Sequence, residues 1–281
     1  MTTIKSFIKR HPVMTYFVIT FVISWGAILM VMGPGGILGT EEVPETLMTF
    51  VYMAMLLGPS IAGLSLTGIV DGRAGFRELF SRLRSWRVGA GWYVVALLTA
   101  PLLMGGVAFA LSLFSPAFVP TIVAANDKVS VLVSGIVAGI LVGIFEELGW
   151  TGFAIPRLRL LYSVLVTGLI VGFLWGLWHF PLFLGSASLS GSVPPALFVA
   201  VLLFSFLPAF RVLMVWVYDR TRSLLVVMLM NVSLTASTLI LQPQATGAQA
   251  VTYNLALTVA LWVIVAVVAV ANGGRLESRA R

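Results

Sequence analysis

Along the sequence, long apolar runs alternate with short segments that hold most of the polar and basic residues. A helix needs about 20 apolar residues to cross the hydrocarbon core of a bilayer, and the chain contains about eight such runs. The predicted spans are residues 12–32, 47–69, 92–114, 131–154, 163–184, 195–217, 223–242 and 251–271. The pattern therefore predicts an all-α polytopic membrane protein, a single membrane domain over residues 1–281 in which about eight transmembrane helices form one bundle.

Basic residues keep to one side of this pattern. They flank the first span and fill every second loop and the tail, at Lys5, Lys9, Arg10, Arg73, Arg77, Arg82, Arg84, Arg87, Arg157, Arg159, Arg220, Arg222, Arg275, Arg279 and Arg281. The alternate loops hold one base, Lys128, and the acids Glu41, Glu42, Glu45 and Asp127. Because loops rich in Lys and Arg stay in the cytoplasm, both termini are predicted to be cytoplasmic.

The second loop, residues 71–91, has apolar residues at helical spacing between its arginines. These residues are Phe76, Leu79, Phe80, Leu83 and Trp86. Such a pattern is typical of an amphipathic helix on the inner leaflet of the membrane. A solvated basic loop is the alternative interpretation.

The amino-acid composition limits the partners and the metal ligands that the chain can have. Hydrophobic residues make up 59% of the chain, charged residues 10%, and the mean hydropathy is +1.06. The net charge of +7 lies beside the apolar runs, which favours the lipid bilayer rather than nucleic acid as a partner. There is no cysteine, so any metal ligands must come from Glu, Asp, Asn and the two histidines, His11 and His179.

The fourth span contains two adjacent acids, Glu146 and Glu147. An acid at mid-bilayer costs about 2.5–3.5 kcal/mol on insertion scales, so a pair indicates a function or a specific partner. Neighbouring residues on a helix point about 100° apart, so both cannot face the same spot. We expect one carboxylate to line a cavity, as a general base or acid, and the other to pair with or orient its neighbours.

Two rows of glycine follow helical spacing in the fourth and fifth spans. They are Gly135, Gly139 and Gly143, and Gly168, Gly172 and Gly176. Rows of small residues let helices approach closely. Because the two spans are neighbours in sequence, we expect them to pack along these rows and to bring Glu147 near His179. Glu147, Asn231 and His179 lie at similar depths in the membrane only if the fifth span begins near Gly168, so we expect it to begin there.

Other polar residues lie inside later spans. Asn231, Thr235 and Thr238 form a stripe on the seventh span, and Arg211 lies within the sixth. Polar stripes either join helices or serve a site, and an Arg near a helix end can extend to the membrane surface. We predict that Arg211 instead faces the bundle and partly neutralises the Glu pair.

The sequence around these residues resembles a known family. Glu146-Glu147-Leu148-Gly149-Trp150, Pro156-Arg157-Leu158 and Trp175-Gly176-Leu177-Trp178-His179-Phe180-Pro181 are similar to the first two motifs of the CPBP family, the CAAX-prenyl proteases and bacteriocin-processing enzymes also called Abi. Ser223 to Leu241 falls where the third motif belongs. The resemblance covers about residues 130–242, the expected CPBP-like catalytic core.

This resemblance implies an intramembrane endopeptidase whose cavity opens toward the cytoplasmic half of the membrane. It implies that Glu146 activates water, that Glu147 supports it, and that His179 binds the water or the substrate carbonyl. The histidine of the third motif falls on Asn231, which would polarise the carbonyl, and its asparagine falls on Thr235. The expected substrate is a membrane-associated peptide or protein at the inner membrane of a bacterium.

The chain departs from the family at three positions, Thr151 in place of an arginine, Trp175 in place of phenylalanine and Asn231 in place of histidine. Both a zinc site, with Glu147 and His179 as candidate ligands, and a metal-free mechanism are open, although an amide suits zinc poorly. An alternative function is that of a weakened or inactive family member, acting as a membrane binding or immunity protein. A transporter is a third alternative function, but the sequence shows no internal repeat of the kind found in transporters.

Overall fold

The computed structural model describes residues 2–41, 43–272 and 276–277. Glu42, Arg275, Arg279 and Arg281 from the charge pattern lie outside this range. Helices and short 3-10 or π turns make up the ordered elements, and the described residues form no β-strand. Within them, seven helical segments are long and apolar enough to cross a membrane, and a bent pair of shorter helices raises the number to eight when counted as one span. The all-α polytopic prediction is confirmed.

The helices in chain order are α1 (Thr2–Arg10), α2 (Pro12–Leu38), α3 (Glu45–Val70), α4 (Gly72–Leu83), α5 (Ala90–Ser112), α6 (Thr121–Ala124), α7 (Lys128–Glu147), α8 (Ile155–Leu158), α9 (Val164–Trp178), α10 (Phe180–Leu184), α11 (Pro195–Phe204), α12 (Phe206–Thr221), α13 (Leu224–Leu241) and α14 (Gly247–Ala271). The short turns are η1 (Pro116–Phe118), η2 (Trp150–Ala154) and η3 (Gly185–Leu189), of which η2 is π-helical.

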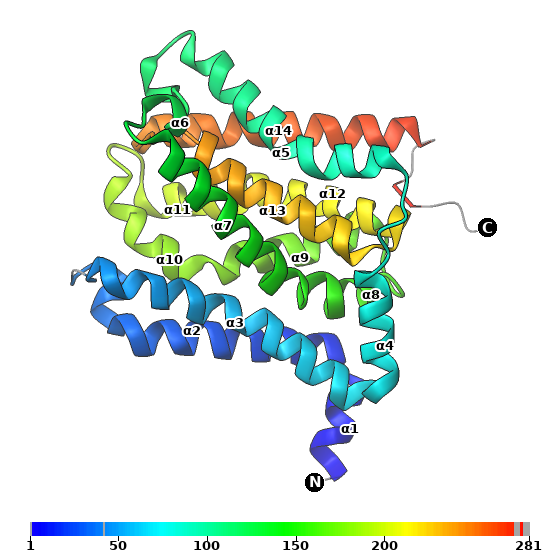
Figure 1. Ribbon diagram of the computed structural model, residues 1–281. Helices are drawn as coiled ribbons and strands as arrows, with labels where there is room; N and C mark the ends of the chain where they lie inside the picture. Colours follow the sequence, from blue (N-terminus) through cyan, green and yellow to red (C-terminus); the bar gives the residue numbers. More distant parts are fainter. Residues whose placement is uncertain (1, 42, 273–275, 278–281) are drawn as a thin grey trace.

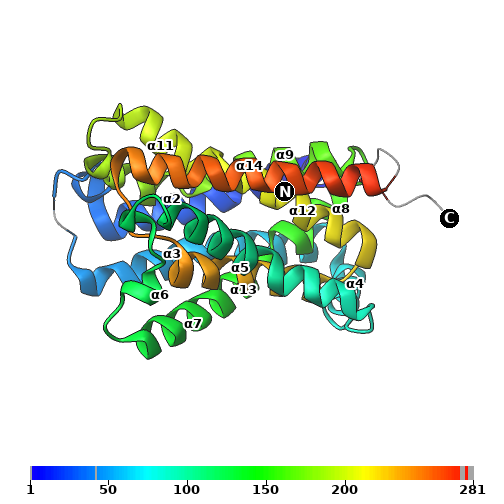
Figure 2. The same ribbon diagram turned by 90° about the horizontal axis from the view of Figure 1, so that it is seen from above.

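The long helices form one bundle (Figure 1). α2 and α3 pack as a pair along one side, α13 lies between α5 and α7, and α12 packs against α9. The view turned by 90° places α14 and α7 at opposite edges (Figure 2). One end of the bundle carries α4, α8 and the Arg222 turn between α12 and α13, and we call it the basic end. The opposite end carries α6, η3 and the start of α14.

Side-chain caps fix where three of the central helices begin. Asp127 accepts a hydrogen bond from Ser130 N at 2.9 Å at the start of α7, and Ser223 accepts one from Val226 N at 3.2 Å at the start of α13. Ser163 does the same for Val166 N at 3.1 Å. This cap satisfies an amide of the first turn, so the helix α9 begins at Val164, four residues before Gly168. Where the fifth span enters the membrane stays a prediction.

The two glycine rows pack against different helices from those expected. A methyl group added at Gly139 would lie 2.6 Å from the carbonyl oxygen of Val232 on α13, so α7 packs on α13. A methyl group added at Gly172 would lie 2.6 Å from Cα of Pro208 on α12, so α9 packs on α12. The prediction that the rows face each other was wrong, because each row had a closer partner later in the chain.

The predicted helix in the second loop is present as α4, and it covers the basic end of the bundle. Leu79 is buried against Leu224, while Phe80 stays exposed. Arg82 donates hydrogen bonds of 3.0 Å to the Gly152 carbonyl and to Tyr218 Oη. These contacts hold α4 across the start of α13 and the turn after α7, and its place on the inner leaflet stays a prediction.

Candidate active site

Four helices deliver polar side chains to one buried cluster. Glu146 and Glu147 end α7, and Trp175 lies in the last turn of α9. Because the glycine rows bring α13 against α7 and α12 against α9, Asn231 and Arg211 reach the same place. The cluster therefore depends on two close helix contacts between segments far apart in the sequence.

Glu147 is fully buried and has a partner on each carboxylate oxygen. Its Oε1 accepts hydrogen bonds from Arg211 Nη1 at 2.7 Å and from Asn231 Nδ2 at 2.9 Å. Its Oε2 accepts a hydrogen bond from the Thr151 hydroxyl, one turn further along the chain. Arg211 is also fully buried. The prediction that Arg211 faces the bundle and neutralises the Glu pair is confirmed for Glu147.

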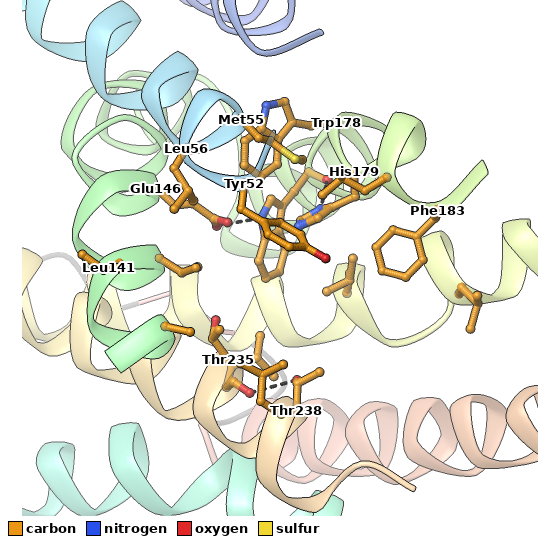
Figure 3. A pocket seen from close by; sticks show the side chains of 18 of the residues that line it. Tyr52, Met55, Leu56, Leu141, Glu146, Trp178, His179, Phe183, Thr235 and Thr238 are labelled. Atoms are coloured by element: carbon orange, nitrogen blue, oxygen red, sulfur yellow. Dashed lines mark hydrogen bonds between the residues drawn. The ribbon is translucent and has the colours of Figure 1, made fainter. Parts of the chain in front are cut away.

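Glu146 faces a pocket instead (Figure 3). Its Oε2 accepts hydrogen bonds from Trp175 Nε1 at 2.8 Å and from Asn231 Nδ2 at 3.2 Å. No hydrogen bond from another described residue reaches Oε1. The turn of about 100° between neighbouring helical residues thus gives the two acids different surroundings. Glu146 offers an oxygen to the pocket, while both oxygens of Glu147 are occupied.

Arg211 and Trp175 connect the two carboxylates. The Arg211 guanidinium carbon lies 4.1 Å from the centroid of a Trp175 ring, a cation–π contact in a desolvated place. The same indole donates to Glu146, and the same guanidinium pairs with Glu147. The ring and the guanidinium therefore hold each other in the position that serves both acids.

His179 lies at the break between α9 and α10, which meet at an angle of 54°. Pro181 lacks an amide hydrogen and prevents α9 from continuing unbroken. Nδ1 of His179 lies 2.8 Å from the Trp175 carbonyl oxygen. A carbonyl oxygen only accepts, so Nδ1 carries the hydrogen, and Nε2 of the neutral ring holds a lone pair. His179 lines the same pocket as Glu146.

Asn231 lies behind the pocket wall and bridges the acids. Its amide nitrogen donates to both carboxylates, while its Oδ1 is buried without a partner among the described residues. Thr235, one turn further along α13, lines the pocket. The structure therefore places the two third-motif positions differently, with Asn231 between the carboxylates and Thr235 facing the pocket.

The pocket has a volume of about 640 Å³ and a mostly apolar wall. α3, α7, α9, α10, α13 and their neighbours contribute to it, with Tyr52, Leu141, Phe183 and Thr238 among the side chains in Figure 3. It extends from Glu146 toward the end of the bundle opposite the basic end. The charge pattern predicts that the basic end is cytoplasmic. On that prediction, the pocket runs away from the side toward which it was expected to open.

One segment of the chain matches the model of a known protein family. Residues 128–236 match the model of the type II CAAX prenyl endopeptidase Rce1-like family. This segment is similar to the Rce1-like family. The Rce1-like segment begins with α7 and ends within α13, so it includes both glutamates, His179, Arg211 and Asn231. It confirms the resemblance to CPBP proteases. No curated protein sequence matches the chain.

The donors in the Rce1-like segment fit a zinc ion poorly. A catalytic zinc usually has three protein ligands. Among the described residues, no group of three or more His, Asp or Glu side chains could hold a metal ion. Of the two candidate ligands, His179 faces the pocket, whereas Glu147 has both oxygens engaged by Arg211, Asn231 and Thr151.

Sequence reasoning missed two contributors to the cluster. Thr151 and Trp175 entered it only as departures from the family pattern, yet each donates a hydrogen bond to a carboxylate. A signal for Thr151 was present, because it lies four residues after Glu147 and so on the same helical face. Trp175 gave no such signal, since its partner comes from another helix.

Proposed function

We propose that the chain is an intramembrane endopeptidase that hydrolyses peptide bonds of membrane-associated substrates, with Glu146 as the general base. The observation that carries this proposal is the arrangement of Glu146, whose Oε2 is held by Trp175 and Asn231 while the side chain lines an apolar pocket that also contains His179. A carboxylate held in this way can take a proton from water without first losing its position.

In the proposed reaction, a water molecule donates one hydrogen bond to Glu146 Oε1 and the other to the lone pair on His179 Nε2. The water oxygen attacks the peptide carbonyl carbon as its proton passes to Glu146. Glu146 then returns this proton to the leaving nitrogen as the C–N bond breaks. The products are a carboxylate and an amine, and Glu146 is ready for another cycle once the new carboxyl group has lost its proton.

The oxyanion of the tetrahedral intermediate needs a hydrogen-bond donor. Asn231 has its amide hydrogens directed at Glu146 and Glu147, so it is poorly placed for this role. Thr235 lines the pocket, and its hydroxyl makes no hydrogen bond to another described residue. We assign the oxyanion contact to Thr235 and a positioning role to Asn231.

Glu147 and Arg211 support this site from behind. Their ion pair balances charge in a region without exposed surface, and Glu147 also anchors the Asn231 amide that holds Glu146. The membrane is proposed to be the inner membrane of a bacterium, with both termini in the cytoplasm. The chemistry proposed is metal-free.

The test is incubation of the purified protein in detergent with a library of membrane peptides, followed by mass spectrometry of the products. Loss of a general base lowers rates by about 10²–10⁴, so Glu146→Gln should abolish detectable cleavage. Glu78→Gln, which removes an exposed carboxylate on α4, should cleave like the wild type. Cleavage by Glu146→Gln at the wild-type rate would refute the proposal.

A second candidate function is favoured by Asn231. Where the family has histidine, this chain has an amide whose hydrogens are occupied, which fits an inactive member that binds a membrane partner or confers immunity. In that case the wild type should cleave no peptide, and a bound partner should be retained equally by Glu146→Gln.

A further inference from the structure

The pocket leads away from the basic end of the bundle. Along α7, Glu146 is the wall residue nearest the basic end, and Ala138 is the one farthest from it. The other helices agree, since the wall uses Thr49 near the start of α3 and Gln242 just beyond the end of α13. Ser186 in η3 completes the wall at that same end.

Aromatic side chains close the pocket on the other side of Glu146. Trp150, in the π-helical turn after α7, is fully buried between Tyr16 and Trp178, with ring centroids 5.6 and 5.8 Å away. Phe153 is fully buried as well and packs 5.5 Å from Tyr16. Outside this layer, Arg82 of α4 holds the Gly152 carbonyl. Two layers therefore separate Glu146 from the basic end.

Three wall residues on α3 and α13 lie partly on the surface of the bundle. Tyr52 and Met53 on α3 are 50% and 36% exposed, and Leu239 on α13 is 46% exposed. Further toward the end opposite the basic end, the loops that follow α2, α10 and α13 gather. Gly39 packs against Gly185, and Thr121 donates a hydrogen bond of 2.6 Å to the Gln242 carbonyl.

We propose that the substrate of the proposed protease reaches Glu146 from the extracytoplasmic side of the membrane. This inference rests on the proposed function, because the occupant of the pocket is a substrate only if the chain is a protease. It also rests on the charge pattern, which identifies the cytoplasmic side of the membrane. Wall residues on α3 and α13 reach the surface of the bundle, whereas Trp150 and α4 cover the basic end.

The chemistry of the wall selects the occupant. Its residues include Glu146 and His179 but no Lys or Arg among the described residues, so it offers no cation to a free carboxylate terminus. Thr49, Ser186, Thr238 and Gln242 supply uncharged polar groups between apolar side chains. The occupant is an extended, uncharged apolar peptide segment, bound within its chain rather than by a charged end.

The absence of cysteine makes the chain a natural background for a labelling experiment. Thr235→Cys and Thr238→Cys each place one thiol in the pocket. Ser188→Cys in η3 and Ser81→Cys in α4 place one on the exposed surface at either end of the bundle. Each variant is treated with a membrane-impermeant maleimide in spheroplasts and in inside-out vesicles of a bacterial host, and in detergent to show that the thiol can react.

The proposal expects Thr235→Cys, Thr238→Cys and Ser188→Cys to react in spheroplasts and Ser81→Cys to react in inside-out vesicles. Reaction of both pocket thiols from the cytoplasmic side alone, or from neither side while they react in detergent, would overturn it. Labelling requires no proteolysis, so the result is separate from the test of the enzyme.

The occupant is tested on the same pocket thiols in detergent. An uncharged apolar peptide blocked at both ends should slow labelling of Thr235→Cys several-fold and leave Ser81→Cys unchanged. Equal or better protection by the same peptide with a free carboxylate would overturn the assignment of an internal segment.

Discussion

The buried pair of Arg211 and Glu147 gives a sharp prediction for Arg211→Leu. The two side chains lie 2.7 Å apart with no exposed surface, so removing the cation leaves a lone carboxylate in the bundle. Removing one partner of a buried pair costs about 3–5 kcal/mol. Asn231 and Thr151 still donate hydrogen bonds to Glu147. We therefore expect the loss of the ion pair to cost about 3 kcal/mol of unfolding free energy, near the lower limit of that range. Loss of the contact with Trp175 adds about 1–2 kcal/mol.

The measurement is the free energy of unfolding in mixed detergent micelles, with Arg77→Leu on the exposed face of α4 as the matched control. We expect the control to change little, and Arg211→Leu to lose about 4–5 kcal/mol. The double variant Arg211→Leu with Glu147→Gln should lose less than Arg211→Leu, because the lone charge is gone. Equal, small losses for Arg211→Leu and Arg77→Leu would refute the reasoning, and so would a double variant no more stable than Arg211→Leu.

Three further predictions address the rest of the site. Gly139→Ala should lower the melting temperature in detergent, because its methyl group would lie 2.6 Å from a backbone oxygen of α13, whereas Gly106→Ala, with open space around it, should not; equal effects would contradict the close contact. Trp175→Phe keeps a ring but removes the donor to Glu146, so kcat should fall more than KM changes, and an unaltered kcat would count against that role. Asn231→His should raise proteolysis or zinc uptake in a way that Glu146→Gln abolishes, and no gain beside an active wild type would show that the amide is sufficient.

The sequence alone determined the membrane class and most of the spans, and it singled out the two acids of the fourth span. Apolar runs of about 20 residues identify spans locally, because every backbone polar group in lipid must be satisfied within its own helix. α2, α3, α5, α7, α13 and α14 therefore lie close to their predicted positions. The Glu pair was conspicuous for the same reason, since ionisable residues are costly in that environment.

Tertiary structure decided which helices meet, and with that the arrangement of the site. A row of glycines indicates that some helix approaches closely, but it does not identify the partner. The α7 row accepts α13 and the α9 row accepts α12, and this choice brings Asn231 and Arg211 to the acids. Which acid faces the pocket also depended on the packing, because the 100° between neighbouring residues fixes only their difference in direction.

The direction of the pocket was likewise set by contacts between distant segments. Tyr16 on α2, Trp150 after α7 and Trp178 at the end of α9 meet in one layer that closes the basic end. The three come from separate segments of the chain, and the sequence contains no local signal that they will touch. Spans and charges follow from local physics, whereas closure and opening depend on how side chains from separate helices fill the same space.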